Sequence, residues 1–285
     1  MNNLLNLIIL HVSGDITIIM KNNIFLIKQL RELTGAGLIE CKKALIQTKY
    51  NINNAVDFLR NLGKIRAFEQ LTNKTIQGSI FIENKDNCGS MIELNSETDF
   101  VAKSKEFITF GKSIVNLSIS DQIDDINTLR NKCEEKRIEL VLKVRENINI
   151  QKFILLKSNN IISYLHRDRI GVLIVFINKN NNLELLKQIA MHIAASKPRF
   201  LSMHDIPQSI IDREYKIQLS IVSKLDKPKL ILDRIIEGRM KKFKSEISLL
   251  TQPFVIDRTK TIQQLLKENN LQIESYFRFE VGEII

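Results

Sequence analysis

The feature that most constrains the fold is a change in the spacing of apolar residues near position 75. Before this point apolar side chains recur three and four positions apart, which is the period of one helix face. From Ser79 onward apolar and polar residues alternate, which is the period of a half-buried strand. A chain that begins with helices and continues with short strand pairs separated by helices is typical of an α+β fold, not of a doubly wound sheet.

Three helices are predicted before this change, and together they form an N-terminal module over residues 20–73. Their apolar positions are Ile27, Leu30 and Leu33, then Leu38, Cys41 and Leu45, and finally Ala55, Phe58, Leu59 and Leu62. Asn53 is the expected N-cap of the third helix, and Gly63 is its expected end. A module of this size is too small to be an enzyme by itself.

Two strand hairpins are predicted next, and each is followed by helix. The expected elements are strands Ser79–Glu83 and Ser90–Asn95 with a helix from Thr98 or Asp99 and a second at Ile126–Val144, then strands Ile161–His166 and Gly171–Ile177 with helix Leu183–Ser196. The apolar face of the helix that begins at Thr98 or Asp99 is Val101, Phe107, Phe110, Ile114 and Leu117. The recurrence predicts a duplicated architecture of antiparallel sheet plus helices, without a repeat at the level of residues.

The remaining pattern predicts an inserted helical hairpin and a return to the sheet. Helices Ile210–Leu225 and Lys229–Phe243 are split by a short turn, which makes them antiparallel neighbours. The alternation from Ile273 to Val281 indicates a last strand. The expected divisions are an extension at 1–19, the three-helix module at 20–73, core subdomains at 74–158 and 159–213, the helical hairpin at 214–243, and a return to the second subdomain at 244–285.

Composition excludes several classes of protein. No apolar run reaches the roughly 18 to 20 residues that cross a bilayer, so we expect no membrane span. The three cysteines lie far apart and form no metal-binding spacing, which indicates idle thiols in a reducing cytoplasm. The N-terminal stretch carries no Lys or Arg before Lys21, so it lacks the charged region of a secretory signal. We interpret residues 1–19 as dispensable, with Met20 as the working start.

Motifs for nucleotide binding and for catalysis are missing. The sequence contains no GxxxxGK[ST] and no GxGxxG, and its four histidines never fall at a metal-binding spacing. We therefore expect no cofactor, no metal and no nucleotide bound directly by this chain. A net charge of +10 favours an anionic partner without identifying one. The overall pattern favours a binding or regulatory protein.

Eight sequence blocks resemble those of a known family, and they occur in that family's order. They are Ile27-Lys28-Gln29-Leu30-Arg31-Glu32-Leu33-Thr34-Gly35-Ala36-Gly37, Cys41-Lys42-Lys43-Ala44-Leu45, Glu97-Thr98-Asp99-Phe100-Val101-Ala102-Lys103, Arg169-Ile170-Gly171-Val172-Leu173, Ala190-Met191-His192-Ile193-Ala194-Ala195-Ser196-Lys197-Pro198, Glu237-Gly238-Arg239-Met240-Lys241-Lys242-Phe243, Gln252-Pro253-Phe254-Val255 and Arg278-Phe279-Glu280-Val281-Gly282. From about residue 24 to residue 283 the chain resembles bacterial translation elongation factor Ts.

The resemblance implies a fold and an activity. In that family the N-terminal module is similar to a ubiquitin-associated domain. Family members bind elongation factor Tu in its GDP form, promote release of the nucleotide, and stay bound until GTP binds. The resemblance therefore implies an exchange factor and not an enzyme. It also assigns Thr98, Asp99, Phe100 and Val101 to a wedge that disturbs the Mg²⁺ site of the partner.

Further residues are implied to bind the partner. They are Arg31, Cys41, Lys42, Lys43, His166, His192, Lys197 and Pro198. Simpler interpretations stay open for several residues: Asp99 as a helix cap, Phe100 as local core, His192 as a core histidine, and the lysines as a solvated helix face. Relatives commonly continue into a C-terminal helix that packs on the partner, whereas this sequence ends at Ile285, which implies weaker or faster-exchanging binding.

Two other interpretations compete with partner exchange. The first is a basic RNA- or ribosome-associated protein without exchange activity, which the charge favours. Against nucleic acid, the positive charge is spread along the chain and no RNP-type aromatic motif is present. The second is an interaction scaffold similar to ubiquitin-associated domains. The hairpin at 214–243 is also a candidate for self-association.

Overall fold

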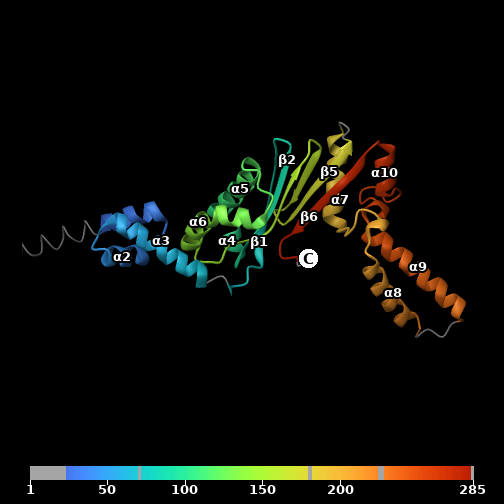
Figure 1. Cartoon of the computed structure of the whole chain (residues 1–285), viewed down its shortest axis with the longest axis horizontal. Coiled ribbons are helices and arrows are strands. Elements are labelled where there is room, and N and C mark those ends of the chain that lie inside the picture. The colour runs from blue at the N-terminus through green and yellow to red at the C-terminus, as the bar shows by residue number, and fades with distance from the viewer. Residues whose placement is uncertain (1–23, 70–71, 179–181, 224–227, 284–285) are drawn as a thin grey trace, which may run out of the picture. The chain divides into compact units, whose positions relative to one another are not determined.

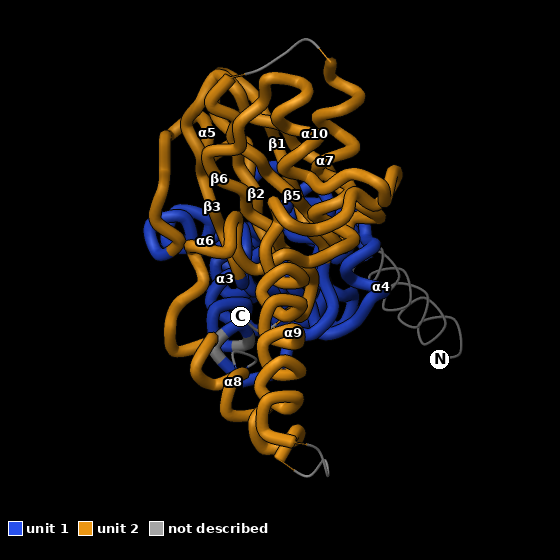
Figure 2. The backbone as a smooth tube through the Cα atoms, turned by 90° about the vertical axis from the view of Figure 1, so that its right-hand side faces the viewer, with its two compact units in different colours: residues 1–78, 94–114, 127–151 blue, residues 79–93, 115–126, 152–285 orange. Residues whose placement is uncertain are grey.

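The computed structural model describes residues 24–69, 72–178, 182–223 and 228–283 (Figure 1). The chain forms two compact units, and each is assembled from several segments (Figure 2). The first unit comprises residues up to 78 together with 94–114 and 127–151, and the second comprises 79–93, 115–126 and 152–285. The divisions expected from the sequence stay predictions. The expected extension at 1–19 lies outside the described residues.

The N-terminal module consists of three helices, as predicted. A first helix over residues 24–34 is followed by α2 (Leu38–Gln47) and α3 (Ile52–Glu69). Their buried side chains form one cluster, made of Leu30, Ala36, Cys41, Ala44, Leu45, Ala55 and Leu59 with Leu142 from a later helix. Five of these, Leu30, Cys41, Leu45, Ala55 and Leu59, are positions that the helical period placed on inner faces. Leu33, Leu38 and Phe58 were also expected on inner faces but are exposed.

Two details of α3 differ from the sequence prediction. The helix begins one residue after Asn51, whose side-chain oxygen accepts a hydrogen bond from the Asn54 amide at 3.1 Å, so Asn51 and not Asn53 occupies the cap position. Gly63 does not end α3, which continues to Glu69. A Cβ at Gly63 would lie 3.3 Å from Ile138 Cγ2 and 3.5 Å from Leu142 Cβ, so this glycine allows another helix to approach closely.

The first sheet is a hairpin joined by a strand that returns after helices. Its elements are β1 (Gln77–Lys85), β2 (Cys88–Ser96), α4 (Asp99–Ala102), α5 (Lys105–Ser120), α6 (Ile126–Val144) and β3 (Asn149–Lys157), with strand order β1-β2-β3. Asp86 and Asn87 have φ values of 52° and 60°, as a tight hairpin turn requires. β3 was not predicted, because its four consecutive apolar residues at 153–156 hide the alternation of a strand.

The second sheet repeats this plan. Its elements are β4 (Ile161–His166), β5 (Ile170–Asn178), α7 (Leu183–Ser196), the 3₁₀ turn η2 (Met203–Asp205), α8 (Gln208–Val222), α9 (Lys229–Ile247), the 3₁₀ turn η3 (Leu249–Thr251), α10 (Ile262–Glu268) and β6 (Gln272–Glu280). Strands β4, β5 and β6 are antiparallel neighbours in that order, and Ile170 pairs with both His166 and Glu280. The α+β class and its duplicated sheets are thus confirmed.

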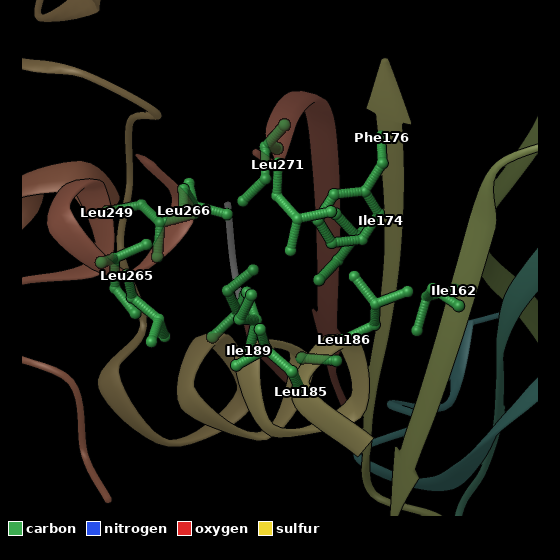
Figure 3. Close-up of a cluster of buried hydrophobic side chains, with 14 of the residues drawn as sticks. Ile162, Ile174, Phe176, Leu185, Leu186, Ile189, Leu249, Leu265, Leu266 and Leu271 are labelled. Carbon is green, nitrogen blue, oxygen red and sulfur yellow. The ribbon is translucent and has the colours of Figure 1, made fainter. Parts of the chain in front are cut away.

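The largest described core cluster fills the space between α7, α10 and one face of this second sheet (Figure 3). Ile174 and Phe176 of β5 meet Leu186 and Ile189 of α7, and all four are buried. Leu186 and Ile189 lie three positions apart, which is the spacing of one helix face. Burial of side chains of this size contributes about 1.5 to 3 kcal/mol each.

Helices α8 and α9 lie side by side and form the predicted helical hairpin (Figure 1). Val222, Ile236 and Met240 are buried between them. Several apolar side chains on the two helices are exposed instead: Tyr215, Ile217, Leu219, Ile221, Leu230 and Ile231. No helix among the described residues is both long enough and apolar enough to cross a membrane.

Candidate functional site

The turn that carries Phe100 is the most unusual surface feature of the first unit. Helix α4 is only four residues long and places Phe100 with 83% of its surface exposed. This is the highest exposed fraction among the large apolar side chains of the described residues, which makes Phe100 a candidate for contact with another molecule. Ala102 in the same turn is buried, so the two ends of α4 face in different directions. The interpretation of Phe100 as local core is wrong.

Thr98 anchors this turn, because every polar group of Thr98 takes part in a hydrogen bond. Its amide donates to Glu146 Oε2 at 2.9 Å, and its hydroxyl donates to Glu146 Oε1 at 2.6 Å. The same hydroxyl accepts from the Val101 amide at 3.4 Å, which makes Thr98 the N-cap of α4. Its carbonyl accepts from the Ser96 hydroxyl at 2.8 Å. The cap is therefore Thr98 and not Asp99.

Asp99 has a different partner. Its carboxylate accepts a hydrogen bond from Lys103 Nζ at 2.7 Å, one turn further along the chain. This hydrogen bond, together with the charge of Lys103, lowers the pKa of Asp99 below its ordinary value. Asp99 is therefore an anion at neutral pH and half-exposed beside Phe100. The wedge residues thus present one aromatic ring and one carboxylate to solvent.

The expected partner-binding residues of the N-terminal module divide by exposure. Arg31, Lys42 and Lys43 are exposed on the first helix and on α2, where they can meet an acidic surface. Cys41 is completely buried, and its thiol contacts the Ala36 carbonyl. Burial raises the pKa of the Cys41 thiol, so it is neutral. Cys41 therefore packs in the core of the module, and a contact between Cys41 and a partner stays a prediction.

The second unit shows the same division. His166 is exposed at the end of β4, where its ring stacks on Tyr164 with centroids 6.2 Å apart. His192 is 1% exposed, and its Nε2 lies 2.9 Å from Gln252 Oε1. Pro198 is also buried, and its carbonyl accepts a hydrogen bond from the Tyr276 hydroxyl at 2.8 Å. His192 therefore packs in the core, whereas Pro198 lines the groove described next, and partner contacts through these two residues stay predictions.

Lys197 lies between these two buried residues but is itself exposed. It ends α7 in the left-handed conformation, with φ 48° and ψ 49°, and its ammonium group forms an ion pair with Glu280. An open groove of about 890 Å³ begins here and follows β6, with a lining that includes Arg199, Phe200 and Phe277. The lining also includes Asp205 and Glu274, so the groove combines aromatic side chains with charges of both signs.

Sequence reasoning missed the acidic residue that holds the wedge turn. Glu146 follows the end of α6 and carries no local signal, because its hydrogen-bond partner Thr98 lies 48 positions earlier. The next residue, Asn147, contacts the residue before Thr98: the Asn147 backbone amide donates a hydrogen bond to Glu97 Oε1 at 2.7 Å. Among the described residues, no group of acidic, histidine or cysteine side chains is arranged to hold a metal ion.

Comparison with known proteins is consistent with this description. The family described as Elongation factor TS matches residues 97–283. Elongation factor Ts from Buchnera aphidicola subsp. Acyrthosiphon pisum (strain APS) is 47% identical over 268 residues, which cover 93% of this chain and 99% of that protein. The protein of the same name from Cronobacter sakazakii (strain ATCC BAA-894) is 44% identical over 258 residues, 90% of each chain.

The duplicated α+β fold, the exposed aromatic turn and these similarities together define a translation elongation factor. More closely, the chain belongs to the elongation factor Ts family, as the eight sequence blocks predicted.

Proposed function

We propose that this chain is a guanine nucleotide exchange factor for elongation factor Tu. It binds the GDP form of that GTPase, promotes GDP release by disturbing the Mg²⁺ site with Thr98, Asp99, Phe100 and Val101, and stays bound until GTP binds. It acts in the cytoplasm on a partner that itself holds the nucleotide, and it performs no covalent chemistry. The observation that carries the proposal is the 83% exposure of Phe100 on a firmly bonded turn.

The chemistry of the wedge suits this task. Burying a phenyl ring in a partner is worth about 1.5 to 3 kcal/mol, which is a useful contribution toward opening a nucleotide site. The turn is held by hydrogen bonds before any partner arrives, so little conformational entropy is lost on binding. The carboxylate of Asp99 adds a negative charge that can compete for groups around a cation.

Thermodynamics sets what the wedge must do. An exchange factor accelerates release only if it binds the empty form of its partner better than the GDP form. By linkage, GDP then weakens the binding of the exchange factor by the same factor. We therefore assign Phe100 to a contact that the partner offers fully only when its nucleotide site is open.

The test measures release of a fluorescent GDP analogue from elongation factor Tu by stopped flow. The unchanged chain should accelerate release, and Phe100→Ala should reduce the acceleration about 10- to 100-fold, because each 1.4 kcal/mol corresponds to a factor of ten. Ile256→Ala is the matched control, since Ile256 is also apolar and exposed but lies on a separate loop. Its rate should equal that of the unchanged chain.

Two outcomes contradict the proposal. Acceleration that survives in Phe100→Ala would remove the wedge from the mechanism while leaving exchange in place. No acceleration by the unchanged chain would refute the exchange function. In that case RNA binding that weakens steeply with salt would favour the basic RNA-associated alternative.

Self-association through residues 214–243 is a further proposal, and exposed apolar side chains on α8 and α9 support it. Tyr215 and Leu219 lie one turn apart on α8, and Leu230 is 67% exposed on α9. Sedimentation of the unchanged chain and of Leu219→Glu at several concentrations tests this proposal. A concentration-dependent mass that the variant abolishes is expected.

A further inference from the structure

We propose that Glu146 is a positioning residue for nucleotide exchange: it sets the direction in which Phe100 is presented. This inference rests on the proposed exchange function, and it assigns part of that function to a residue outside the wedge. Glu146 is not part of the wedge turn, because it lies two residues after the end of α6.

Both carboxylate oxygens of Glu146 accept a hydrogen bond from Thr98. One carboxylate oxygen of Glu146 accepts the Thr98 amide at 2.9 Å, and the other accepts the Thr98 hydroxyl at 2.6 Å. Two hydrogen bonds donated by one residue to one planar carboxylate fix both the position and the rotation of that residue. Phe100 lies two residues further on, so its direction follows from that of Thr98.

A second carboxylate, that of Glu97, forms matching hydrogen bonds with the segment that carries Glu146. Glu97 Oε1 accepts the Asn147 amide at 2.7 Å and the Asn73 side-chain amide at 2.9 Å. Glu97 therefore holds the residue after Glu146, while Glu146 holds the residue after Glu97. We call these four residues, 97, 98, 146 and 147, the carboxylate bracket. Asn147 is 4% exposed and also donates to the Asn73 carbonyl at 3.1 Å, so one side of the bracket is anchored in the interior.

The wedge needs hydrogen bonds from outside α4, because a helix of four residues is not stable by itself. A helix of one turn has too few internal hydrogen bonds to be stable alone. Its own contacts are the Thr98 cap, the exposed Asp99–Lys103 pair and three backbone hydrogen bonds, donated by the amides of residues 102, 103 and 104. Without Glu146 the turn samples other conformations, and the apparent activity falls in proportion to the fraction that presents Phe100 correctly.

Two variants separate a positioning role from loss of structure. Glu146→Ala removes both acceptors, whereas Glu146→Gln keeps one acceptor for the Thr98 amide and places an amide donor near the Thr98 hydroxyl. Glu139→Ala is the matched control, since Glu139 is an exposed carboxylate on α6. We expect Glu146→Ala to lower the GDP release rate at saturating concentrations about 10-fold, and Glu146→Gln to restore most of it.

A double-mutant cycle with Phe100→Ala gives the decisive readout. If Glu146 acts through Phe100, Glu146→Ala causes no further loss in the Phe100→Ala background. A merely structural role would instead add its own loss in both backgrounds. Equal rates for the unchanged chain and Glu146→Ala, or fully additive losses, would overturn the inference.

Amide hydrogen exchange in the isolated chain tests the bracket without any partner. Glu146→Ala should remove protection at residues 98–101, and Glu139→Ala should leave it unchanged. Protection that persists in Glu146→Ala overturns the inference whatever the exchange activity. If the unchanged chain fails to release GDP, the proposed function fails, and loss of protection still establishes that Glu146 holds the turn.

Discussion

Nε2 of His192 lies 2.9 Å from Oε1 of Gln252, and this contact defines the protonation state of the imidazole ring. The Val255 amide approaches Nδ1 at 3.2 Å. Because an amide can only donate, Nδ1 carries no proton and Nε2 does. The Gln252 side-chain nitrogen donates a hydrogen bond to the Glu246 carbonyl at 2.6 Å, so the Gln252 side-chain oxygen must face His192. His192 is thus a neutral, fully bonded core residue.

Protonation of His192 should destabilise the fold below neutral pH. Burial lowers the pKa of His192 from its ordinary value of 6.5. Between the folded and unfolded pKa values the unfolded chain binds more protons, so the free energy of unfolding falls as the pH falls from about 7 through that window. The slope is at most about 1.4 kcal/mol per pH unit. Urea unfolding at pH 7.5 and pH 5.5 measures this loss.

His192→Gln is the control for this effect, because a neutral amide has no proton to gain. Its stability should differ less between the two pH values than that of the unchanged chain. Glu280 does not contribute to the difference between pH 7.5 and pH 5.5. Hydrogen bonds from Lys197 and, to a smaller extent, from Arg278 hold the pKa of Glu280 below its ordinary value of 4.5. Its contribution is lost only in more acidic solution. Equal pH dependence in both proteins would contradict the lowered pKa of His192.

A second prediction concerns a buried ion pair in the second unit. Lys152 Nζ lies 2.9 Å from Glu93 Oε2, and the two side chains are 13% and 0% exposed. The other Glu93 oxygen accepts the Gly282 amide at 2.8 Å, so the pair ties the end of the chain to β2. Lys152→Met should cost about 3 to 5 kcal/mol of unfolding free energy, because it leaves a buried carboxylate without its cation.

Neutralising both partners should restore much of this loss. The double variant Glu93→Gln with Lys152→Met keeps an acceptor for Gly282 and leaves no buried charge. Chemical denaturation of the three proteins gives the comparison. A double variant less stable than Lys152→Met alone would show that the lysine is not needed to neutralise Glu93.

The fold was largely predictable because its signals are local. Leu30 and Leu45 lie in the core of the N-terminal module, and the helical spacing alone identified them. The sequence prediction was wrong where packing between elements overrides the local conformational preference of a residue. Gly63 has the appearance of a helix end, but α3 continues through it because Ile138 and Leu142 pack against a position that must lack a side chain. Strand β3 was not predicted, because several consecutive apolar residues obscure the alternation that identifies a strand.

The candidate site was predictable only in part, and for a similar reason. The motif that contains Phe100 is contiguous, so resemblance alone could assign it. Glu146 lies in a separate segment, and its relation to Thr98 is a hydrogen bond across 48 positions that no periodicity encodes. Exposure is equally invisible in a motif: Lys42 and the adjacent Cys41 both match the family, but only Lys42 reaches solvent.

Two glycines in family motifs should respond in opposite ways to alanine. A Cβ at Gly171 would lie 2.6 Å from Ile80 Cγ2 and 2.7 Å from Met91 Sδ, so Gly171→Ala should cost about 1 to 3 kcal/mol. Gly238 lies within α9 with no atom near such a Cβ, so Gly238→Ala should stabilise the protein by up to about 1 kcal/mol. Thermal unfolding distinguishes them, and equal shifts would contradict this account.

The exposed lysines of the N-terminal module should act through association rate. Lys42 and Lys43 are solvated on α2, and long-range attraction to an acidic partner accelerates encounter more than it strengthens the final complex. Reversing both charges to Glu should slow association with elongation factor Tu about 3- to 10-fold at low salt, and the difference should shrink near 0.5 M salt, roughly where charges are screened. Lys241→Glu with Lys242→Glu on α9 makes the same change in net charge and should slow association less. If both double variants slow it equally, overall charge and not the α2 surface guides the encounter, and the assignment of Lys42 and Lys43 fails.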